Sequence, residues 1–302
     1  MSISKKPLSR LQSDLILLFT AAVWGSGFIA QRIAAPSTNV FLFNGCRFLI
    51  GALLLFPLIK FRLEIPKKQL RNVIIAGLLL FSAGALQQAG MQTTSAGNAG
   101  FITGLYVVIV PIFLYVFWKQ KQHWVIWISA SLAIVGMLLL STGGVIKFVP
   151  GDLLEFLGAI LWAMHVIVVG ISVRQLNPLH FAVGQFLASA FFNLIFGLMF
   201  DPQSLLMIPD LWLAIVYNGV FSVAIGFTLQ GVGQENAPST DAALILSMEA
   251  VFAALFGFIF LHERFTPIQL LGCFFVMIAI LFSQLPFDKM IRFMSKKSGT
   301  QL

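Results

Sequence analysis

Two charged side chains lie deep inside apolar stretches of this sequence, and they are the strongest candidates for chemistry. Glu249 falls about ten residues into the stretch 240–261, which at about 1.5 Å per residue is about 13 Å from its start. A carboxyl at that depth is costly and by default marks a substrate or proton pathway. We interpret Glu249 as a contact for a substrate amine or as a proton carrier. The alternative is a neutral carboxyl that hydrogen-bonds a neighbouring helix.

Arg47 is the second deep charge, about 10 Å from the start of the stretch 40–59 by the same helical rise. Three interpretations stay open for it. Arg47 pairs with Glu249, or it holds an anionic group of a substrate, or it only satisfies backbone carbonyls and helix ends. Its partner in the internal repeat described below is Gln185, so any role of its charge is one-sided.

Aromatic and uncharged polar residues in other apolar stretches add candidate contacts. Trp24 and Trp162 fall near the middle of their stretches, whereas Trp normally gathers at membrane interfaces. They either line a cavity, where a ring stacks on a substrate or engages a cation, or they only pack. His165 lies nearly one turn from Trp162 and either shuttles protons or makes a structural hydrogen bond. Gln88 and Asn218 either join helices or face a solute cavity.

Small residues and a proline predict how one helix packs and bends. Gly100 and Gly104 form a G-x-x-x-G pattern, which predicts close helix packing and gives weak support for a dimer. Pro111 follows in the same stretch and removes one helical hydrogen bond. We expect a bend there that allows the helix to flex.

The elements that position these residues are predicted to be membrane-spanning helices. The chain is 59% hydrophobic and 10% charged, with a mean hydropathy of +0.94, whereas soluble domains carry about 25% charged residues. A helix needs about 20 apolar residues to cross a hydrocarbon core of about 30 Å. Ten such stretches occur, at 14–34, 40–59, 72–91, 98–117, 123–142, 152–173, 179–200, 211–232, 240–261 and 267–286. The connections are short, so we expect one integral membrane unit.

Basic residues predict the orientation of the spans. With the N-terminus inside, the cytoplasmic segments hold Lys5, Lys6, Arg10, Lys60, Arg62, Lys67, Lys68, Arg71, Lys119, Lys121, Arg174, Lys289, Arg292, Lys296 and Lys297. The opposite side holds only Arg32, Lys147 and Arg264. This asymmetry follows the positive-inside rule and predicts that both termini are cytoplasmic. The net charge of +8 is therefore a topology signal, and no nucleic-acid partner is expected.

The second half of the sequence repeats the first. At an offset of 138 residues, Asp14 falls on Asp152 and Trp24 on Trp162, and the offset drifts to 140 and then 143 along the chain. Each half holds an odd number of spans, so the halves cross the membrane in opposite senses. We therefore predict an all-α membrane protein of ten transmembrane helices in two inverted five-helix repeats. The predicted repeats are residues 1–143 and 144–302.

Three segments resemble the EamA family of the drug/metabolite transporter superfamily. Residues 24–34 (WGSGFIAQRIA) resemble the end of its first helix, 93–113 its fourth-span signature, and 247–272 its ninth-to-tenth-span signature. The resemblance covers nearly the whole chain. It implies a solute transporter, commonly an exporter of amino acids, metabolites or toxic compounds, with a central cavity between the repeats.

The expected function is secondary transport by alternating access. The sequence has no ATP-binding motif, so we expect facilitated or ion-coupled transport, with protons as a candidate coupling ion and an amino acid or related amphipathic compound as the exported solute. The expected protein is a monomer or homodimer in the bacterial inner membrane. The main alternative is an uptake permease or facilitator.

Two further classes are disfavoured by missing motifs. A channel needs rings of like charge or carbonyl filters. An intramembrane enzyme would show patterns such as H-E-x-x-H or G-x-S-x-G, and neither occurs. We therefore expect no enzyme activity, no cofactor and no metal site.

Overall fold

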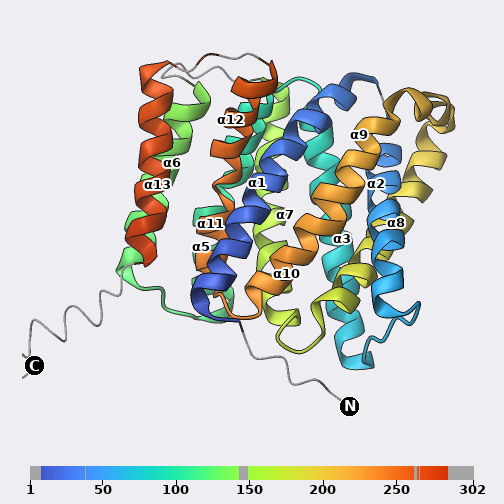
Figure 1. Ribbon diagram of the computed structural model, residues 1–302, viewed down its shortest axis with the longest axis horizontal. Helices are drawn as coiled ribbons and strands as arrows, with labels where there is room; N and C mark the ends of the chain where they lie inside the picture. The colour runs from blue at the N-terminus through green and yellow to red at the C-terminus, as the bar shows by residue number, and fades with distance from the viewer. Residues whose placement is uncertain (1–7, 38, 143–148, 262–263, 265, 285–302) are drawn as a thin grey trace, which may run out of the picture.

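The computed structural model describes residues 8–37, 39–142, 149–261, 264 and 266–284, and within these residues every regular element is a helix (Figure 1). The first half contains α1 (Arg10–Ala34), α2 (Val40–Leu55), α3 (Lys67–Gly90), α4 (Ala96–Gly104), α5 (Tyr106–Trp118) and α6 (Trp124–Thr142). The second half contains α7 (Pro150–Ser172), α8 (Pro178–Phe200), α9 (Trp212–Tyr217), the π-helix η5 (Asn218–Phe227), α10 (Thr228–Gln234), α11 (Ser239–Leu246), α12 (Glu249–Leu261) and α13 (Pro267–Gln284). Four short 3-10 helices are η1 (Ala35–Ser37), η2 (Phe56–Ile59), η3 (Pro202–Met207) and η4 (Pro209–Leu211).

These elements confirm the expected helical membrane protein. Eight helical segments are long and apolar enough to cross a membrane, and α6 and α13 supply two shorter apolar helices. The pairs α4–α5 and α11–α12 each make one span, as does the run from α9 to α10. Each expected stretch therefore corresponds to one span. The expected starts at 14 and 72 are late, because α1 and α3 begin at the charged residues Arg10 and Lys67.

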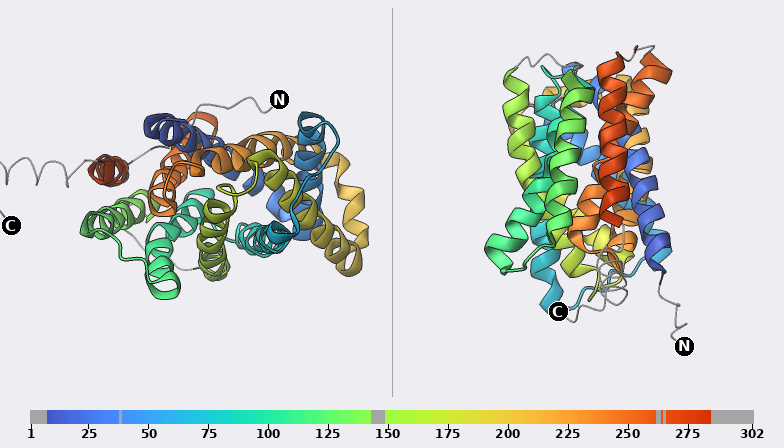
Figure 2. Two further views of the ribbon diagram at one scale, coloured as in Figure 1. Left: turned by 90° about the horizontal axis from the view of Figure 1, so that it is seen from below. Right: turned by 90° about the vertical axis from the view of Figure 1, so that its left-hand side faces the viewer.

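The packing of the helices follows the inverted repeat. α6 packs against α13, and α2 packs against α8, so each of these helices contacts its own counterpart in the other half. The two pairs lie at opposite ends of the bundle, as Figures 1 and 2 show. Between them, α3 packs on α7, and α1 packs on η5, α10 and α12. The predicted boundary at residues 143 and 144 lies outside the described residues and stays a prediction.

The fourth and ninth spans are interrupted at equivalent positions. The amide of Leu105 donates to the carbonyl of Ile102 at 3.1 Å, and the amide of Met248 donates to the carbonyl of Ile245 at 3.1 Å. The two bonds lie at equivalent positions, because the residues that make them are 143 apart in the sequence. Each bond spans three residues, as in a 3-10 turn, and so makes one turn in the middle of the span tighter than an α-helical turn. α5 continues through Pro111, so the interruption lies at Leu105 rather than at the proline.

The G-x-x-x-G pattern is used for packing inside the chain. A Cβ on Gly100 would lie 3.4 Å from the Cα of Ala250 in α12. A Cβ on Gly104 would lie 2.6 Å from the sulfur of Met137 in α6. Both glycines therefore bring α4 close to its neighbours, as small residues do between membrane helices. The hinge role of Pro111 stays a prediction.

Glycines also set the contact between α6 and α13. A Cβ on Gly136 would lie 2.7 Å from the carbonyl oxygen of Gly272, and one on Gly272 would lie 2.5 Å from that of Gly136. The two backbones touch here because neither residue carries a side chain. A close approach of this kind is how membrane helices gain packing energy in lipid.

We predict that Gly272→Ala lowers the free energy of unfolding by about 1–3 kcal/mol, the usual cost of overpacking, because its methyl meets backbone atoms that cannot turn away. The matched control is Gly97→Ala, whose new Cβ would meet nothing within 4 Å. Thermal unfolding of the purified variants in detergent measures the difference. Equal stability of the two variants would contradict the contact.

Candidate functional site

A cavity lies between the two repeats in the middle of the bundle. Helices α1, α2, α3, α4 and α5 of the first repeat and α7, η5, α10 and α12 of the second supply its walls. Glu249, Arg47, Trp24, Trp162 and His165 all line it. Residues that the sequence singled out on four separate helices, α1, α2, α7 and α12, therefore face one space, as a solute site requires.

Glu249 is the first residue of α12, directly after the interruption of the ninth span. Its Oε1 accepts a hydrogen bond from the hydroxyl of Tyr106 at 2.9 Å. Tyr106 is the first residue of α5, and it stands at the position of Glu249 in the other repeat. The two interrupted helices thus bring their equivalent first residues together across the cavity.

Arg47 is almost fully buried, and its guanidinium carbon lies 5.1 Å from the ring centre of Phe48 and 5.6 Å from that of Phe43. Among the described residues it has no ion pair and no hydrogen-bond partner, and its Nε is buried without one. Within the described residues, neither an ion pair with Glu249 nor a hydrogen bond to a backbone carbonyl is present. Binding of an anionic group of a substrate by Arg47 stays a prediction. It is favoured because a buried cation without a partner is costly until an anion or a water molecule binds to it.

Aromatic rings form one wall of the cavity around Phe227. Its ring centre lies 4.8 Å from that of Trp24 and 5.8 Å from that of Trp162, to which it is nearly parallel at 19°. His165 meets Phe227 edge-on at 5.6 Å. The indole Nε1 of Trp24 donates to the carbonyl of Ser222, whereas that of Trp162 is buried without an acceptor. The wall therefore offers apolar faces and one free donor.

The π-helix η5 places part of this wall. Its wider turns carry both Ser222 and Phe227 to the cavity, and π-helical turns frequently occur at functional sites. Gly226 is required here, since a Cβ would lie 2.4 Å from the indole nitrogen of Trp24. No sequence pattern that we used predicts this element.

His165 is held by the counterpart of Arg47. Its Nε2 lies 2.9 Å from Oε1 of Gln185, and its Nδ1 is buried without a partner. Equivalent positions of the two repeats therefore differ in role. Arg47 in the first repeat is an unpaired cation, whereas Gln185 in the second repeat holds His165.

Gln88 and Asn218 are buried but do not line the cavity. The amide of Gln88 donates to the carbonyl of Gln31 in α1 at 3.1 Å, and that of Asn218 donates to the carbonyl of Ala214 in its own span at 3.0 Å. The bond of Gln88 therefore joins α3 to α1, whereas the bond of Asn218 stays within its own span.

The cavity residues that sequence reasoning missed include Tyr106, Phe227 and Gln230. The repeat register carries a signal for Tyr106, because it aligns with Glu249. Gln230 is a fully buried amide whose two polar atoms have no partner, so it offers a donor and an acceptor to a ligand.

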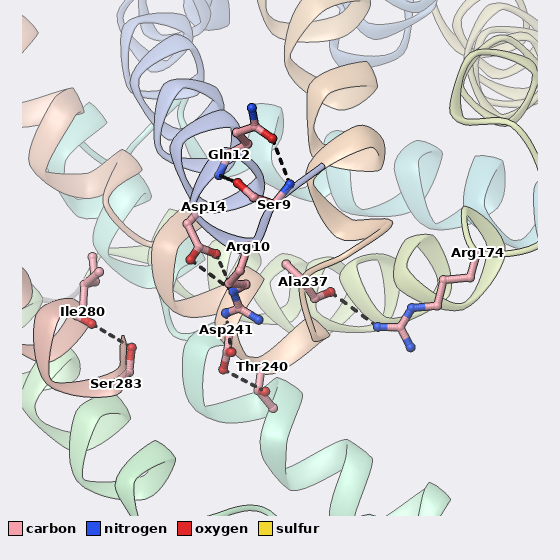
Figure 3. A network of polar contacts seen from close by, with 10 residues as sticks. All are labelled: Ser9, Arg10, Gln12, Asp14, Arg174, Ala237, Thr240, Asp241, Ile280 and Ser283. Carbon is pink, nitrogen blue, oxygen red and sulfur yellow. Dashed lines mark hydrogen bonds and ion pairs between the residues drawn. The ribbon is translucent and has the colours of Figure 1, made fainter. Parts of the chain in front are cut away.

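Polar contacts join the two repeats on one side of the cavity. Arg10 at the start of α1 binds Asp14 through Nε at 2.9 Å and Asp241 at the start of α11 through a terminal nitrogen at 2.5 Å (Figure 3). Close by, Arg174 donates to the carbonyl of Ala237 at 3.5 Å (Figure 3). These side chains are partly exposed, so each pair adds little energy by itself.

A second network occupies the equivalent place in the other repeat. The hydroxyl of Thr94, just before α4, donates to Oδ1 of Asp152 at 2.5 Å, and the amide of Val149 donates to Oδ2 at 3.0 Å. Asp152 is the repeat counterpart of Asp14. Because the repeats are inverted, the two networks lie toward opposite membrane faces, with the cavity between them.

Comparison with known proteins agrees with this architecture. The model of the EamA-like transporter family matches residues 11–142 and again residues 149–285. An uncharacterized transporter of Archaeoglobus fulgidus is 32% identical over 91% of this chain and 86% of its own length. The threonine/homoserine exporter RhtA of Escherichia coli K12 is 26% identical over 85% of this chain and 86% of its own. One solved crystal structure, 18% identical, shares the fold with a TM-score of 0.76 and covers 93% of this chain and 99% of its own.

We predict that Phe227→Ala lowers the free energy of unfolding by about 3 kcal/mol, because it removes the ring against which both cavity tryptophans pack. Phe221→Ala, in the same π-helix but 42% exposed, is the matched control and is expected to cost less than half as much. Thermal unfolding together with tryptophan fluorescence measures both effects. A Phe227→Ala protein with unchanged emission and stability would show that the aromatic wall is not a unit.

Proposed function

The chain belongs to the EamA-like transporter family, and on that premise we propose that it exports amino acids or closely related amphipathic compounds by alternating access. The observation that carries the proposal is the buried, unpaired guanidinium of Arg47 in the same cavity as the carboxyl of Glu249. The relative RhtA, a threonine/homoserine exporter, supports the class of solute.

The two charges suit the two ends of a zwitterion. Arg47, on α2 of the first repeat, binds the carboxylate of the solute in a charge-assisted hydrogen bond. Glu249, on α12 of the second repeat, receives the ammonium group with Tyr106 beside it. The aromatic wall of Trp24, Trp162 and Phe227 accepts the side chain. A bound amino acid thereby bridges both repeats.

The two edge networks provide the alternating access. Opening one face separates Arg10 from Asp241, and opening the other separates Thr94 from Asp152, while the cavity stays between them. The small energy of the partly exposed contact between Arg10 and Asp241 suits a gate that must open in every cycle. The positive-inside rule supports a cytoplasmic face at Arg10 with both termini on that side, and the family supports a location in the inner membrane.

The solute test is flux of labelled L-threonine and L-homoserine in proteoliposomes, with and without an imposed proton gradient. We expect saturable flux that an inward proton gradient accelerates in the direction of export. Saturable flux that ignores the gradient would indicate a facilitator, and gradient-driven movement in the opposite sense would indicate an uptake permease. No flux of either amino acid would contradict the proposed solute class.

We predict that Arg47→Gln raises the KM for threonine at least tenfold, because losing a buried partner of a carboxylate costs about 2–5 kcal/mol and each 1.4 kcal/mol is a factor of about ten. Glu249→Gln should raise the KM in the same way. Arg62→Gln, which removes an exposed cation between α2 and α3, is the control and should leave the KM unchanged. Unchanged KM values in both cavity variants would rule out zwitterion binding by these residues.

A further inference from the structure

A second carboxyl is buried in the bundle beside the cavity, and the proposed function leaves it without a role. Glu155 lies in the second turn of α7 and is fully buried, with 0% of its surface exposed. Its Oε2 accepts a hydrogen bond from the hydroxyl of Thr103 at 3.3 Å. Its Oε1 is buried without any partner and lies against the end of α3, where a Cβ on Gly90 would come within 2.8 Å of it.

The charged groups around Glu155 give it no counter-ion. Asp152 lies on its own helix and is held by Thr94 and Val149. Glu249 of α12 and Tyr106 of α5, which line the neighbouring cavity, are bound to each other. The carboxyl-terminal half of α3 and all of α4 contain no titratable side chain, and Arg32 of α1 donates to the carbonyl of Met91.

An acid in this setting holds a proton. An ionised carboxylate buried in the membrane without a cation is far more costly than the neutral acid. No cation is paired with Glu155 among the described residues. Its Oε1 also receives no hydrogen bond that would stabilise a negative charge.

The one donor to Glu155 belongs to the cavity and to an interrupted helix. Thr103 lines the cavity and accepts a hydrogen bond from the amide of Gln87 at 3.2 Å, so a chain of donors runs from Gln87 through Thr103 to Glu155. Thr103 lies two residues before the interruption at Leu105, whereas Glu155 lies on the uninterrupted α7. A change of bend in the fourth span therefore moves the donor relative to the acid.

We propose that Glu155 is a proton-binding site of the transporter, separate from the solute site, and that Thr103 couples its proton to the bend of the fourth span. When the hydroxyl of Thr103 points at the carboxyl, it stabilises the ionised form; when the span bends away, the acid keeps its proton. By linkage, binding of a proton then favours the conformation in which Thr103 has moved. The proton site stands on its own, and only its use in driving export rests on the proposed function.

The first test needs no solute. Infrared difference spectra between low and high pH report the C=O stretch of a protonated carboxyl, and we expect a band that titrates in the wild type, disappears in Glu155→Gln and remains in Glu249→Gln. Thr103→Val keeps the shape of the side chain but removes the donor, so the band should persist to higher pH. A band that never titrates, or one that Glu155→Gln leaves in place, would overturn the proposal.

The second test separates coupling from transport. Glu155→Gln preserves the volume and an acceptor for Thr103, so exchange of labelled L-threonine at equal pH should stay within about threefold of wild type. Acceleration by a proton gradient should be lost. Gradient-driven accumulation at the wild-type level would overturn the coupling role.

Two outcomes are kept apart by this design. If the wild type moves no threonine, the proposed solute class fails, and the infrared titration still decides the proton site. If Glu155→Gln does not fold, as judged by gel filtration and thermal unfolding, the shift of the band in Thr103→Val decides it, since a purely structural acid would show no titration to shift.

Discussion

Polar groups inside the hydrocarbon of a membrane need partners, and the rest of this structure depends on that constraint. The backbone meets it even where spans are interrupted, because the amides at Leu105 and Met248 keep bonds within their own helices. Several buried side-chain atoms lack partners among the described residues, and those that line the central cavity include Nε of Arg47, the amide of Gln230 and the indole nitrogen of Trp162. A solute or water in the cavity can complete the hydrogen bonds of these groups.

The inverted repeat provides a symmetric scaffold for an asymmetric site. Equivalent positions carry Tyr106 and Glu249, or Arg47 and Gln185, so each charge occurs once. Symmetry of the helices gives the bundle two related arrangements, one open to each face, which alternating access requires. Unequal residues at equivalent positions allow those two arrangements to differ in energy, and therefore to respond to a solute or a proton.

The sequence predicted the fold better than it predicted the site. Hydropathy located every span because each must be an apolar stretch long enough to cross the membrane, and it placed the starts of α1 and α3 after the charged residues Arg10 and Lys67. Depth alone identified Glu249 and Arg47, since a misplaced charge is conspicuous in an apolar stretch. Gln88 showed the limit, because hydropathy does not report which way an amide points. Glu155 lies only one turn inside its helix, a position typical of an acid at the membrane interface. Only the packing of the helices shows that it is fully buried.

A zwitterion bound between Arg47 and Glu249 brings both charges with it, so loading the cavity leaves its net charge unchanged. Export of such a solute then moves no net charge, and the membrane potential does not act on that half of the cycle. If Glu155 returns with one proton, the complete cycle carries one elementary charge, worth about 2.3 kcal/mol per 100 mV. Separate sites for solute and proton thus allow both the pH gradient and the membrane potential to drive export. If the solute and the proton instead bound to the same carboxyl, they would compete for that group.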